Sequence, residues 1–157
     1  MRTSLFIGRF QPFHNAHLKD IKEILKKSDE IIIAIGSSNK KNTKDNPFSY
    51  SERKRMISRT LKANKISNFK IYPVPDIKGD KEWISYIKKK LPKYDVVYSG
   101  NPWTLKCFSE HDLKTKKIKL VKGISSTIIR EKIMNGEKWQ HLVPKEVYKF
   151  ITKIGKI

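Results

Sequence analysis

Two histidines and an arginine close to the start of the chain have the types and spacing of a phosphate-binding site. Arg9 follows Gly8 at the end of a short apolar run, and His14 and His17 come three residues apart where a helix is expected to begin. Residues at positions i and i+3 of a helix share one face, and a helix N-terminus adds free backbone N–H groups and a positive dipole end. We therefore predict that this stretch binds phosphate groups. The alternative is a pair of surface histidines on an ordinary strand–helix unit.

A second group of polar residues lies near the other end of the chain. Ser125, Ser126 and Thr127 stand at an expected helix start, and Arg130 follows one turn later. Hydroxyl groups, backbone N–H groups and a guanidinium at such a terminus can hold a polyphosphate. Alone, the pattern is also that of an N-cap followed by a surface arginine. Together with the histidine stretch, it predicts the second half of one phosphate site.

The segments between these groups alternate between expected strands and expected helices. Short apolar runs predict buried strands, and apolar residues at helical spacing predict the helices that join them. The expected strands are residues 5–7, 31–35, 70–74, 95–99 and 117–121. Alternation at this spacing is typical of right-handed βαβ units. We therefore expect one α/β domain over residues 1–157, with a doubly wound, Rossmann-like, five-stranded parallel sheet.

Such sheets bind ligands beyond the carboxyl ends of their strands, at the point where the strand order reverses. The turns at Gly8, Gly36 and Gly100 each follow an expected strand, and Ser125 follows the last one after a short loop. All four turns are therefore expected at the ligand-binding edge, which would bring the two polar groups together.

Local signals set the expected starts and ends of several helices. Ser49 with Glu52 has the pattern of a capping box. Asn101 before Pro102 predicts an N-cap followed by a proline at the first helical position. Gly136 is expected to close the helix that begins at Ser125 and Ser126.

The chain carries a large excess of positive charge. Its 157 residues include 35 Lys and Arg against 15 Asp and Glu, a formal net charge of +20. Such a charge is one sign of nucleic-acid binding. Only six of the basic residues are arginine, and the lysines are scattered over the expected surface helices without forming one stripe. We therefore expect no specific nucleic acid partner, and we interpret the charge as a compositional bias that also steers anionic nucleotides.

The sequence favours a cytoplasmic protein without membrane contact. Its longest apolar runs are far below the about 20 residues that span a bilayer. Met1 leads almost directly into the first expected strand, which leaves no room for a signal peptide. Cys107 is the only cysteine, so an internal disulfide and a cysteine-based zinc site are excluded. We expect Cys107 to be a small buried hydrophobic residue.

The two polar groups resemble the paired signatures of a known enzyme family. Residues 8–17, Gly-Arg-Phe-Gln-Pro-Phe-His-Asn-Ala-His, resemble the HxGH signature of the nucleotidyltransferase superfamily, and residues 125–130 resemble its later ISSTxxR-type signature. Other segments look like those of archaeal-type nicotinamide-nucleotide adenylyltransferases, and the resemblance extends over nearly the whole chain. These segments are Asn46-Pro47-Phe48, Ser51-Glu52-Arg53, Pro75-Asp76-Ile77 with the later Trp83, and residues 98–102.

Four positions depart from the family pattern. Ala16 stands where the HxGH signature has glycine. Ser126 stands where the archaeal type usually has glycine, and Asp80 stands where it usually has asparagine. The basic residue before Asn46 is displaced by one position, which leaves Lys44 as the nearby candidate.

The resemblance implies adenylyl transfer from ATP to nicotinamide mononucleotide, which gives NAD and pyrophosphate. It implies that His14 and His17 hold the ATP phosphates, while Arg9 and Arg130 clamp the triphosphate and the leaving pyrophosphate. The attacking phosphate oxygen is already ionised at neutral pH, so no general base is needed. Catalysis then rests on positioning and on fixed positive donors.

The resemblance also assigns the remaining binding residues. Trp83 would stack on the pyridine ring of the mononucleotide, the alternative being a core tryptophan, and Asp80 would face the ring's carboxamide. Mg²⁺ would be held by substrate oxygens and water rather than by side chains, and a homo-oligomer, a hexamer, is implied. Phe10 would contact both substrates, and the residues expected to bind ATP are Ile7, Gly8, Phe10, Gly100, Asn101, Ser125, Ser126, Thr127 and Lys44.

Two other functions stay open at the level of sequence. A sibling transferase could use ATP or CTP with another phosphate acceptor, such as FMN, phosphopantetheine or glycerol phosphate, because both signatures would be unchanged. Asp80 weakens the pyridine assignment, since an ionised carboxylate can only accept hydrogen bonds. A basic nucleic-acid-binding module is the second alternative, and it would need a continuous basic face with exposed aromatic side chains.

Overall fold

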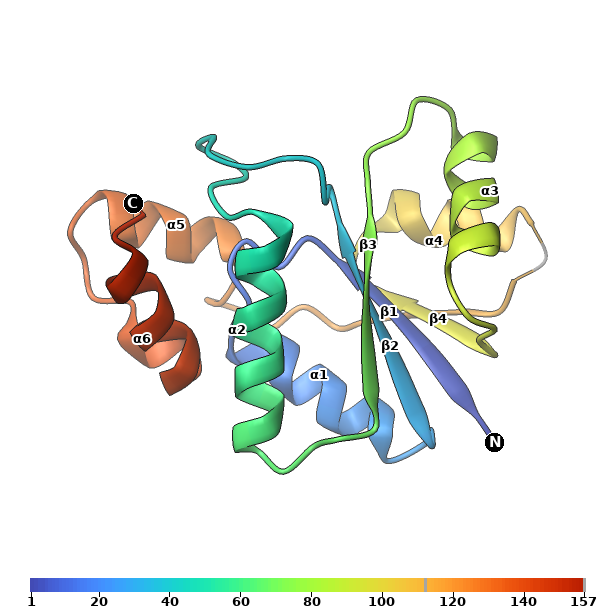
Figure 1. Cartoon of the computed structure of the whole chain (residues 1–157), viewed down its shortest axis with the longest axis horizontal. Helices are drawn as coiled ribbons and strands as arrows, with labels where there is room; N and C mark the ends of the chain where they lie inside the picture. The colour runs from blue at the N-terminus through green and yellow to red at the C-terminus, as the bar shows by residue number, and fades with distance from the viewer. Residues whose placement is uncertain (112, 157) are drawn as a thin grey trace.

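The computed structural model describes residues 1–111 and 113–156 and contains a five-stranded parallel sheet with helices on both faces (Figure 1). The strand order is β3-β2-β1-β4-β5. The elements in chain order are β1 (Thr3–Gly8), α1 (Asn15–Leu25), β2 (Glu30–Gly36), α2 (Tyr50–Ala63), β3 (Phe69–Val74), α3 (Asp80–Lys90), β4 (Val96–Ser99), α4 (Pro102–Ser109), β5 (Thr115–Lys117), α5 (Ser126–Met134), the 3-10 helix η1 (Gln140–Leu142) and α6 (Lys145–Ile154).

The order of the strands confirms the doubly wound α/β fold. From β1 the chain builds outward through β2 to β3, and then crosses back to place β4 on the other side of β1. Each neighbouring pair is parallel, including β2 with β3 and β4 with β5. The strand order therefore reverses between β1 and β4, and a ligand is expected beyond the carboxyl ends of these two strands.

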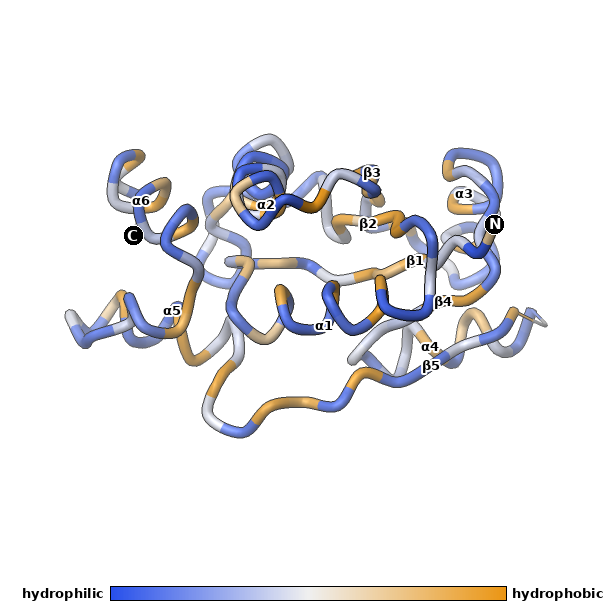
Figure 2. Tube along the Cα trace, turned by 90° about the horizontal axis from the view of Figure 1, so that it is seen from below, coloured by the Kyte–Doolittle hydropathy of each residue, from blue (hydrophilic) through white to orange (hydrophobic). Residues whose placement is uncertain are grey.

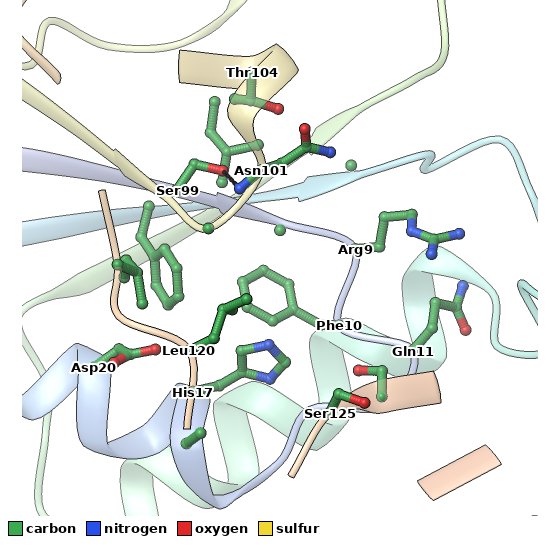
Figure 3. Close-up of a pocket in the computed structure, with 18 of the residues that line it drawn as sticks. Arg9, Phe10, Gln11, His17, Asp20, Ser99, Asn101, Thr104, Leu120 and Ser125 are labelled. Carbon is green, nitrogen blue, oxygen red and sulfur yellow. Dashed lines mark hydrogen bonds between the residues drawn. The ribbon is translucent and has the colours of Figure 1, made fainter. Parts of the chain in front are cut away.

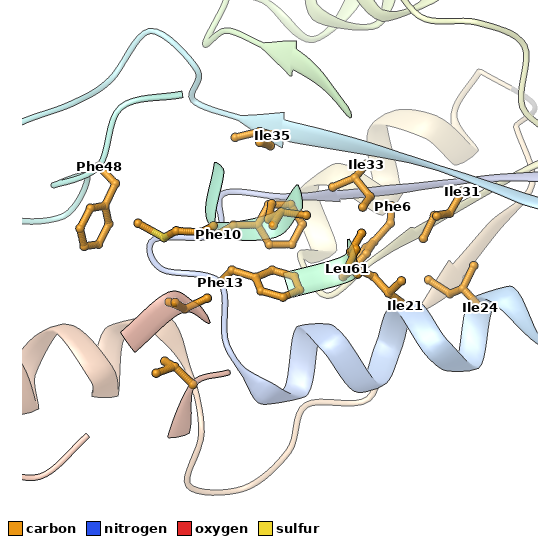
Figure 4. Close-up of a cluster of buried hydrophobic side chains, with 14 of the residues drawn as sticks. Phe6, Phe10, Phe13, Ile21, Ile24, Ile31, Ile33, Ile35, Phe48 and Leu61 are labelled. Atoms are coloured by element: carbon orange, nitrogen blue, oxygen red, sulfur yellow. The ribbon is translucent and has the colours of Figure 1, made fainter. Parts of the chain in front are cut away.

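Alternate residues of the central strands supply two separate cores. Phe6, Ile31 and Ile33 point to the face covered by α1, α2 and α6, where they join a large cluster that includes Phe10 and Phe13 (Figure 4). Leu5, Ile7, Ile32, Ala34 and Val97 point to the opposite face, which α3 and α4 cover. Burial on both faces explains why β1 and β2 are continuous apolar runs in the sequence.

The predicted fifth strand is wrong in its position. Residues 117–121 were expected to form it, whereas β5 ends at Lys117. Lys117 pairs with Ser99, the last residue of β4, after which the chain turns into α4, so no neighbouring strand is present to continue the ladder. Leu120 and Val121 are consequently exposed, at 81% and 43% of their surface. The apolar run lies along the carboxyl edge of the sheet instead.

The predicted helix ends are confirmed by their hydrogen bonds. The backbone N–H of Glu52 donates to Ser49 Oγ (3.2 Å), and the backbone N–H of Ser49 donates to Glu52 Oε1 (2.8 Å), which completes the capping box of α2. Asn101 caps α4 and Ser125 caps α5 through their side-chain oxygens. Gly136 follows α5 with a φ of +67°, the left-handed conformation that closes a helix.

The lysine-rich surface is distributed over the molecule. Figure 2 shows hydrophilic residues along the labelled helices rather than on one side of the molecule. Among residues 1–111 and 113–156, none of the helices has the length and apolar character needed to cross a bilayer.

Candidate active site

A cavity of about 690 Å³ opens at the carboxyl edge of the sheet, beyond β1 and β4 (Figure 3). Its walls come from the loops after these two strands, the start of α1, the chain around residues 118–121 and the start of α5. A cavity of this size at a topological switch point is suited to a nucleotide. The sequence placed both polar groups at this edge, and both line the cavity.

His14 and His17 form a reciprocal cap at the start of α1. The backbone N–H of His14 donates to His17 Nδ1 (3.1 Å), and the backbone N–H of His17 donates to His14 Nδ1 (3.4 Å). The two rings stack with their centroids 3.6 Å apart and their planes at 16°. Because each Nδ1 accepts a hydrogen bond, each neutral ring carries its proton on Nε2. Those two N–H groups are left for a ligand.

Burial keeps both imidazoles uncharged near neutral pH. It lowers the pKa of His14 from 6.5 to about 4. It also lowers the pKa of His17 well below its ordinary value, and a charge on His14 lowers it further. The site therefore presents two neutral donors next to the N-terminus of α1, and the formal positive charge comes from arginines.

Arg9 and Arg130 supply that charge from opposite ends of the chain. Both line the cavity. Arg130 is 7% exposed and donates from NH1 to the backbone oxygen of Gln11 (2.8 Å) and from NH2 to Thr127 Oγ1 (3.3 Å). Burial lowers the pKa of Arg130, and the nearby charge of Arg9 lowers it further. An anion between the two guanidinium groups would relieve this repulsion.

Ser125, Ser126 and Thr127 begin α5 at the cavity wall. Ser125 Oγ accepts from the backbone N–H of Ile128 (3.1 Å) and caps the helix. Ser126 Oγ donates to the backbone oxygen of Pro12 (2.8 Å), so the serine that replaces the family's glycine ties α5 to the first loop. The two signatures, far apart in sequence, are joined by this bond and by the bond from Arg130 to Gln11.

Most of the predicted site residues line this one cavity, and two do not. Lys44 lines a second, smaller cavity of about 310 Å³, which also contacts Arg130. Asp80 is exposed in the first turn of α3 and lies outside the residues that line the main cavity. Burial raises the pKa of the Cys107 thiol, and the neighbouring Asp80 carboxylate raises it further. The predicted residues that do line the main cavity are Ile7, Gly8, Arg9, Phe10, His14, His17, Trp83, Gly100, Asn101, Ser125, Ser126, Thr127 and Arg130.

The ring of Phe10 explains why the first loop requires Gly8. Phe10 has a φ of +54°, a left-handed conformation that is strained for a non-glycine residue, and its ring is 2% exposed. The ring packs against Phe6, Phe13 and His17, at centroid distances of 5.4, 5.9 and 4.7 Å. A Cβ at Gly8 would lie 3.0 Å from this ring. A side chain there would displace Phe10 and, with it, the support of His17.

Arg53 is a positioning residue that the sequence did not single out for such a role. Its side chain is fully buried in α2 and donates to the backbone oxygens of Arg9 (2.9 Å), Gly36 (2.8 Å) and Ser37 (3.1 Å). The pKa of Arg53 is lowered to about 10, mainly by burial and also by the nearby charge of Arg9. The carboxylates of Asp76 and Glu52 raise this pKa and offset part of the shift. One guanidinium thus ties the loop after β1 to the loop after β2.

Gln11 and Asp20 were also missed at the level of sequence. The side chain of Gln11 exchanges two hydrogen bonds of 2.9 Å with the backbone of Phe48, which holds the first loop to the segment before α2. Asp20 lines the cavity one turn after His17, and burial raises its pKa to about 6 against the opposing charge of Lys19. The spacing of Asp20 from His17 was a usable signal, because i and i+3 share a face.

Side-chain ligands for a metal ion are sparse in this part of the molecule. Within the two described ranges there is no group of three or more His, Cys, Asp and Glu side chains that could hold one. Asp20 and Asp76 are the acidic residues among those that line the cavity. This donor set fits a metal carried in by substrate phosphates rather than one caged by the protein.

Residues 5–132 match the family model described as cytidylyltransferase-like. The nicotinamide-nucleotide adenylyltransferase of Methanococcus aeolicus is 44% identical, with 96% of this chain and 88% of the relative covered. The enzyme of the same name from Thermoplasma acidophilum is 40% identical, with 99% of this chain and 88% of the relative covered. This chain belongs to the nicotinamide-nucleotide adenylyltransferase branch of the cytidylyltransferase-like family.

Solved structures of the nicotinamide-nucleotide adenylyltransferase family have the same fold. A bifunctional NMN adenylyltransferase/ADP ribose pyrophosphatase from Francisella tularensis superimposes with a TM-score of 0.87 at 28% identity, over 98% of this chain. A second structure of that enzyme, in complex with AMP and a manganese ion, gives a TM-score of 0.80 at 29% identity, over 98% of this chain. The chain spans about half the length of these two proteins, 49% and 48%.

Proposed function

We propose that this protein transfers the adenylyl group of ATP to nicotinamide mononucleotide and so forms NAD and pyrophosphate. The observation that carries the proposal is the convergence of both signatures on one cavity, where His14, His17, Arg9 and Arg130 surround the N-termini of α1 and α5. The names of the full-length relatives agree with this reaction.

The reaction needs positioning and charge stabilisation more than proton transfer. An ionised phosphate oxygen of the mononucleotide attacks the α-phosphorus of ATP, and the bond from that phosphorus to the oxygen that bridges the α- and β-phosphates breaks. Negative charge moves onto the departing pyrophosphate. We assign the reacting phosphate to the Nε2–H groups of His14 and His17 and to the N-terminus of α1, which the reciprocal cap leaves available. We assign the leaving group to Arg9 and Arg130, which line the same cavity.

A divalent ion, Mg²⁺, completes this proposal. When bound to the triphosphate, Mg²⁺ would neutralise the part of the triphosphate's negative charge that the two arginines do not balance. Its ligands would be phosphate oxygens and water, because the cavity offers no carboxylate cluster in the described chain. The histidine and arginine donors keep the roles given above.

The proposed adenosine contacts are the backbone around Gly8 and Gly100, with Ile7, Phe10 and Asn101 beside them. Ser125, Ser126, Thr127 and Lys44 are proposed on the triphosphate side, Lys44 from the smaller cavity next to Arg130. On the acceptor side the proposal retains Phe10, Trp83 and Asp80.

A panel of substrates tests the proposed function. The purified protein is incubated with ATP or CTP and with nicotinamide mononucleotide, FMN, phosphopantetheine or glycerol phosphate, and pyrophosphate release is measured. We expect the pair of ATP and nicotinamide mononucleotide to be used best. Faster release with another acceptor would overturn the pyridine assignment while leaving the nucleotidyltransferase site in place.

We also propose a homo-oligomer, a hexamer by resemblance to the archaeal family members. Light scattering of the purified chain gives the molar mass, which for one chain is 18.4 kDa. A monomeric mass across a range of protein concentrations would overturn this proposal.

A further inference from the structure

Asp20 places a carboxylate without a hydrogen-bond donor in the wall of the main cavity. The side chain is half-buried and lies one turn after His17 on α1. Figure 3 shows it on the same side of the His17 ring as Leu120, with Arg9 on the other side. Among residues 1–111 and 113–156 no group donates to this carboxylate, and burial raises its pKa against the charge of Lys19. Its oxygens are therefore available to a ligand.

Asp76, the other acidic residue among those that line the cavity, is already partnered. Ser37 Oγ donates to Asp76 Oδ1 (2.9 Å), and the backbone N–H of Asp76 donates to Asn39 Oδ1 (2.9 Å). These bonds give Asp76 a role in joining the loops after β2 and β3. Asp20 makes no comparable contact within the described chain, so its position calls for a different explanation.

The part of the cavity around Asp20 is otherwise apolar. Ala16 is four residues before Asp20, so both share the face of α1 that lines the cavity. Phe6 also lines it, with its ring 6.3 Å from that of His17. The chain after β5 adds Ile118 and Leu120, and Leu120 is 81% exposed. An apolar recess with one hydrogen-bonding group is suited to a flat heterocyclic ring.

The charges in the cavity decide which part of a substrate can lie beside Asp20. Phosphates belong near Arg9, Arg130 and the N-termini of α1 and α5, whereas an ionised carboxylate repels them. The acceptor is proposed on the side of Trp83, which comes from α3. The recess between α1 and the chain after β5 is left for the base of the donor nucleotide.

We propose that Asp20 selects the base of the donor nucleotide by accepting a hydrogen bond from the 6-amino group of adenine. The inference rests on the proposed function, because it takes ATP as the donor. A 6-oxopurine has an oxygen at that position, so two acceptors would face each other without a proton between them. A polar group that is left unpaired in such a recess makes the mismatched base costly to bind.

The first experiment compares ATP with inosine triphosphate, whose base carries oxygen at position 6. We expect kcat/KM of the wild type to be about 10²-fold lower with inosine triphosphate. Asp20→Asn can turn either its oxygen or its NH₂ group toward the base, so the difference should fall below about tenfold. Glu23→Gln is the matched control, because Glu23 is exposed on the same helix and pairs with Lys26. It should keep the preference of the wild type.

A third nucleotide, 2′-deoxyATP, distinguishes the base from the ribose. The ratio of kcat/KM for ATP to that for 2′-deoxyATP should be the same in the wild type and in Asp20→Asn. A change in this ratio, with the preference for ATP over inosine triphosphate intact, would assign Asp20 to a ribose hydroxyl and overturn the inference. An unchanged preference for ATP over inosine triphosphate in folded Asp20→Asn would overturn it as well.

Calorimetry with AMP and IMP provides a readout that needs neither turnover nor an acceptor. The wild type should bind AMP more tightly than IMP, and Asp20→Asn should bind the two with similar affinity. Equal affinities in the wild type would overturn the inference. Failure of the wild type to release pyrophosphate from any donor and acceptor would instead overturn the proposed function, and the comparison of AMP with IMP would still test the role of Asp20.

Discussion

His17 combines two roles in one ring under the proposed function: its Nδ1 accepts the backbone N–H of His14 at the start of α1, and its Nε2–H is the proposed phosphate donor. The two roles can be separated by replacing His17 with asparagine or glutamine, because each side-chain amide has a polar atom near the position of only one of the two ring nitrogens. His17→Asn places an oxygen near the position of Nδ1 and can keep the cap, but it loses the Nε2 donor. We expect turnover to fall by about 10²-fold, the usual effect of losing one preorganised donor.

His17→Gln is the matched variant, because its amide N–H reaches toward the position of Nε2. It should retain more activity than His17→Asn. Thermal unfolding of both variants controls for the packing of the His17 ring against Phe10 and Phe13. Turnover near that of the wild type in folded His17→Asn would contradict the phosphate role.

Arg130 uses a forked side chain to bond Gln11 and Thr127 while it faces the cavity. A lysine keeps the charge but has one nitrogen, so Arg130→Lys cannot keep both bonds and also contact a phosphate. We expect kcat/KM for ATP to fall by at least about tenfold, an effect of 1.4 kcal/mol. Arg55→Lys, at an exposed position of α2, is the control and should leave it unchanged. Full activity of Arg130→Lys would show that the site needs only a positive charge at this position and not the forked guanidinium.

Asp80 tests how the acceptor's ring substituent is recognised. If the Asp80 carboxylate faces the ring, it would repel the ring carboxylate of nicotinate mononucleotide. It would accept a hydrogen bond from the amide N–H of the nicotinamide form. We expect the wild type to prefer the amide form, and Asp80→Asn to weaken the preference. The measurement is kcat/KM for both nucleotides. Equal use by the wild type would mean that Asp80 stays beside Cys107 when the acceptor binds.

At the scale of elements, the site depends on how α2 holds the loops after β1 and β2. Arg53→Met would remove the donors that satisfy the carbonyls of Arg9, Gly36 and Ser37. Each buried carbonyl left unpaired costs about 1–3 kcal/mol, so we expect the free energy of unfolding to fall by about 3 kcal/mol or more. Urea unfolding measures it, with Arg55→Met in the same helix as control. A loss below about 1 kcal/mol would show that water replaces the guanidinium.

The sequence predicted those features that depend on neighbouring residues. It did not predict the features that depend on contacts between distant elements. The caps at Ser49, Asn101 and Ser125 need only neighbouring residues, so their patterns were sufficient. The end of β5 depends on where its partner β4 ends, and the apolar residues at 117–121 carry no information about that. The packing of Trp103 on Trp83 is set by how α3 and α4 meet, and no spacing in the chain encodes it.

At the scale of the whole molecule, the buried histidines couple folding to pH. Between pH 6.5 and about pH 4 the unfolded chain binds a proton that His14 does not bind in the folded state. His17 acts in the same direction, because burial lowers its pKa well below the ordinary value. Stability is therefore present above about pH 6.5 and is lost as the pH falls, by up to about 1.4 kcal/mol per pH unit for each histidine. Asp20 acts in the opposite sense, because its pKa is raised from 3.8 to about 6.

Urea unfolding at pH 7.5, 6.5, 5.5 and 4.5 measures this slope. The double variant His14→Asn/His17→Asn should lose most of the decline below pH 6.5. Asp20→Asn should instead steepen the decline, because Asp20 stabilises the folded state as the pH falls below about 6. An identical slope in the double variant and the wild type would show that other groups govern the acid sensitivity.

The bonds from Ser126 to Pro12 and from Arg130 to Gln11 also constrain the order of events during protein synthesis. The histidines are made early, but the arginine and hydroxyl groups that face them come only after β5. Under the proposed function, a nascent chain that has released its first four strands therefore holds the two histidines and Arg9 but lacks Arg130. We therefore expect a triphosphate to bind only after α5 has been made, when Ser126 and Arg130 can bond to the first loop.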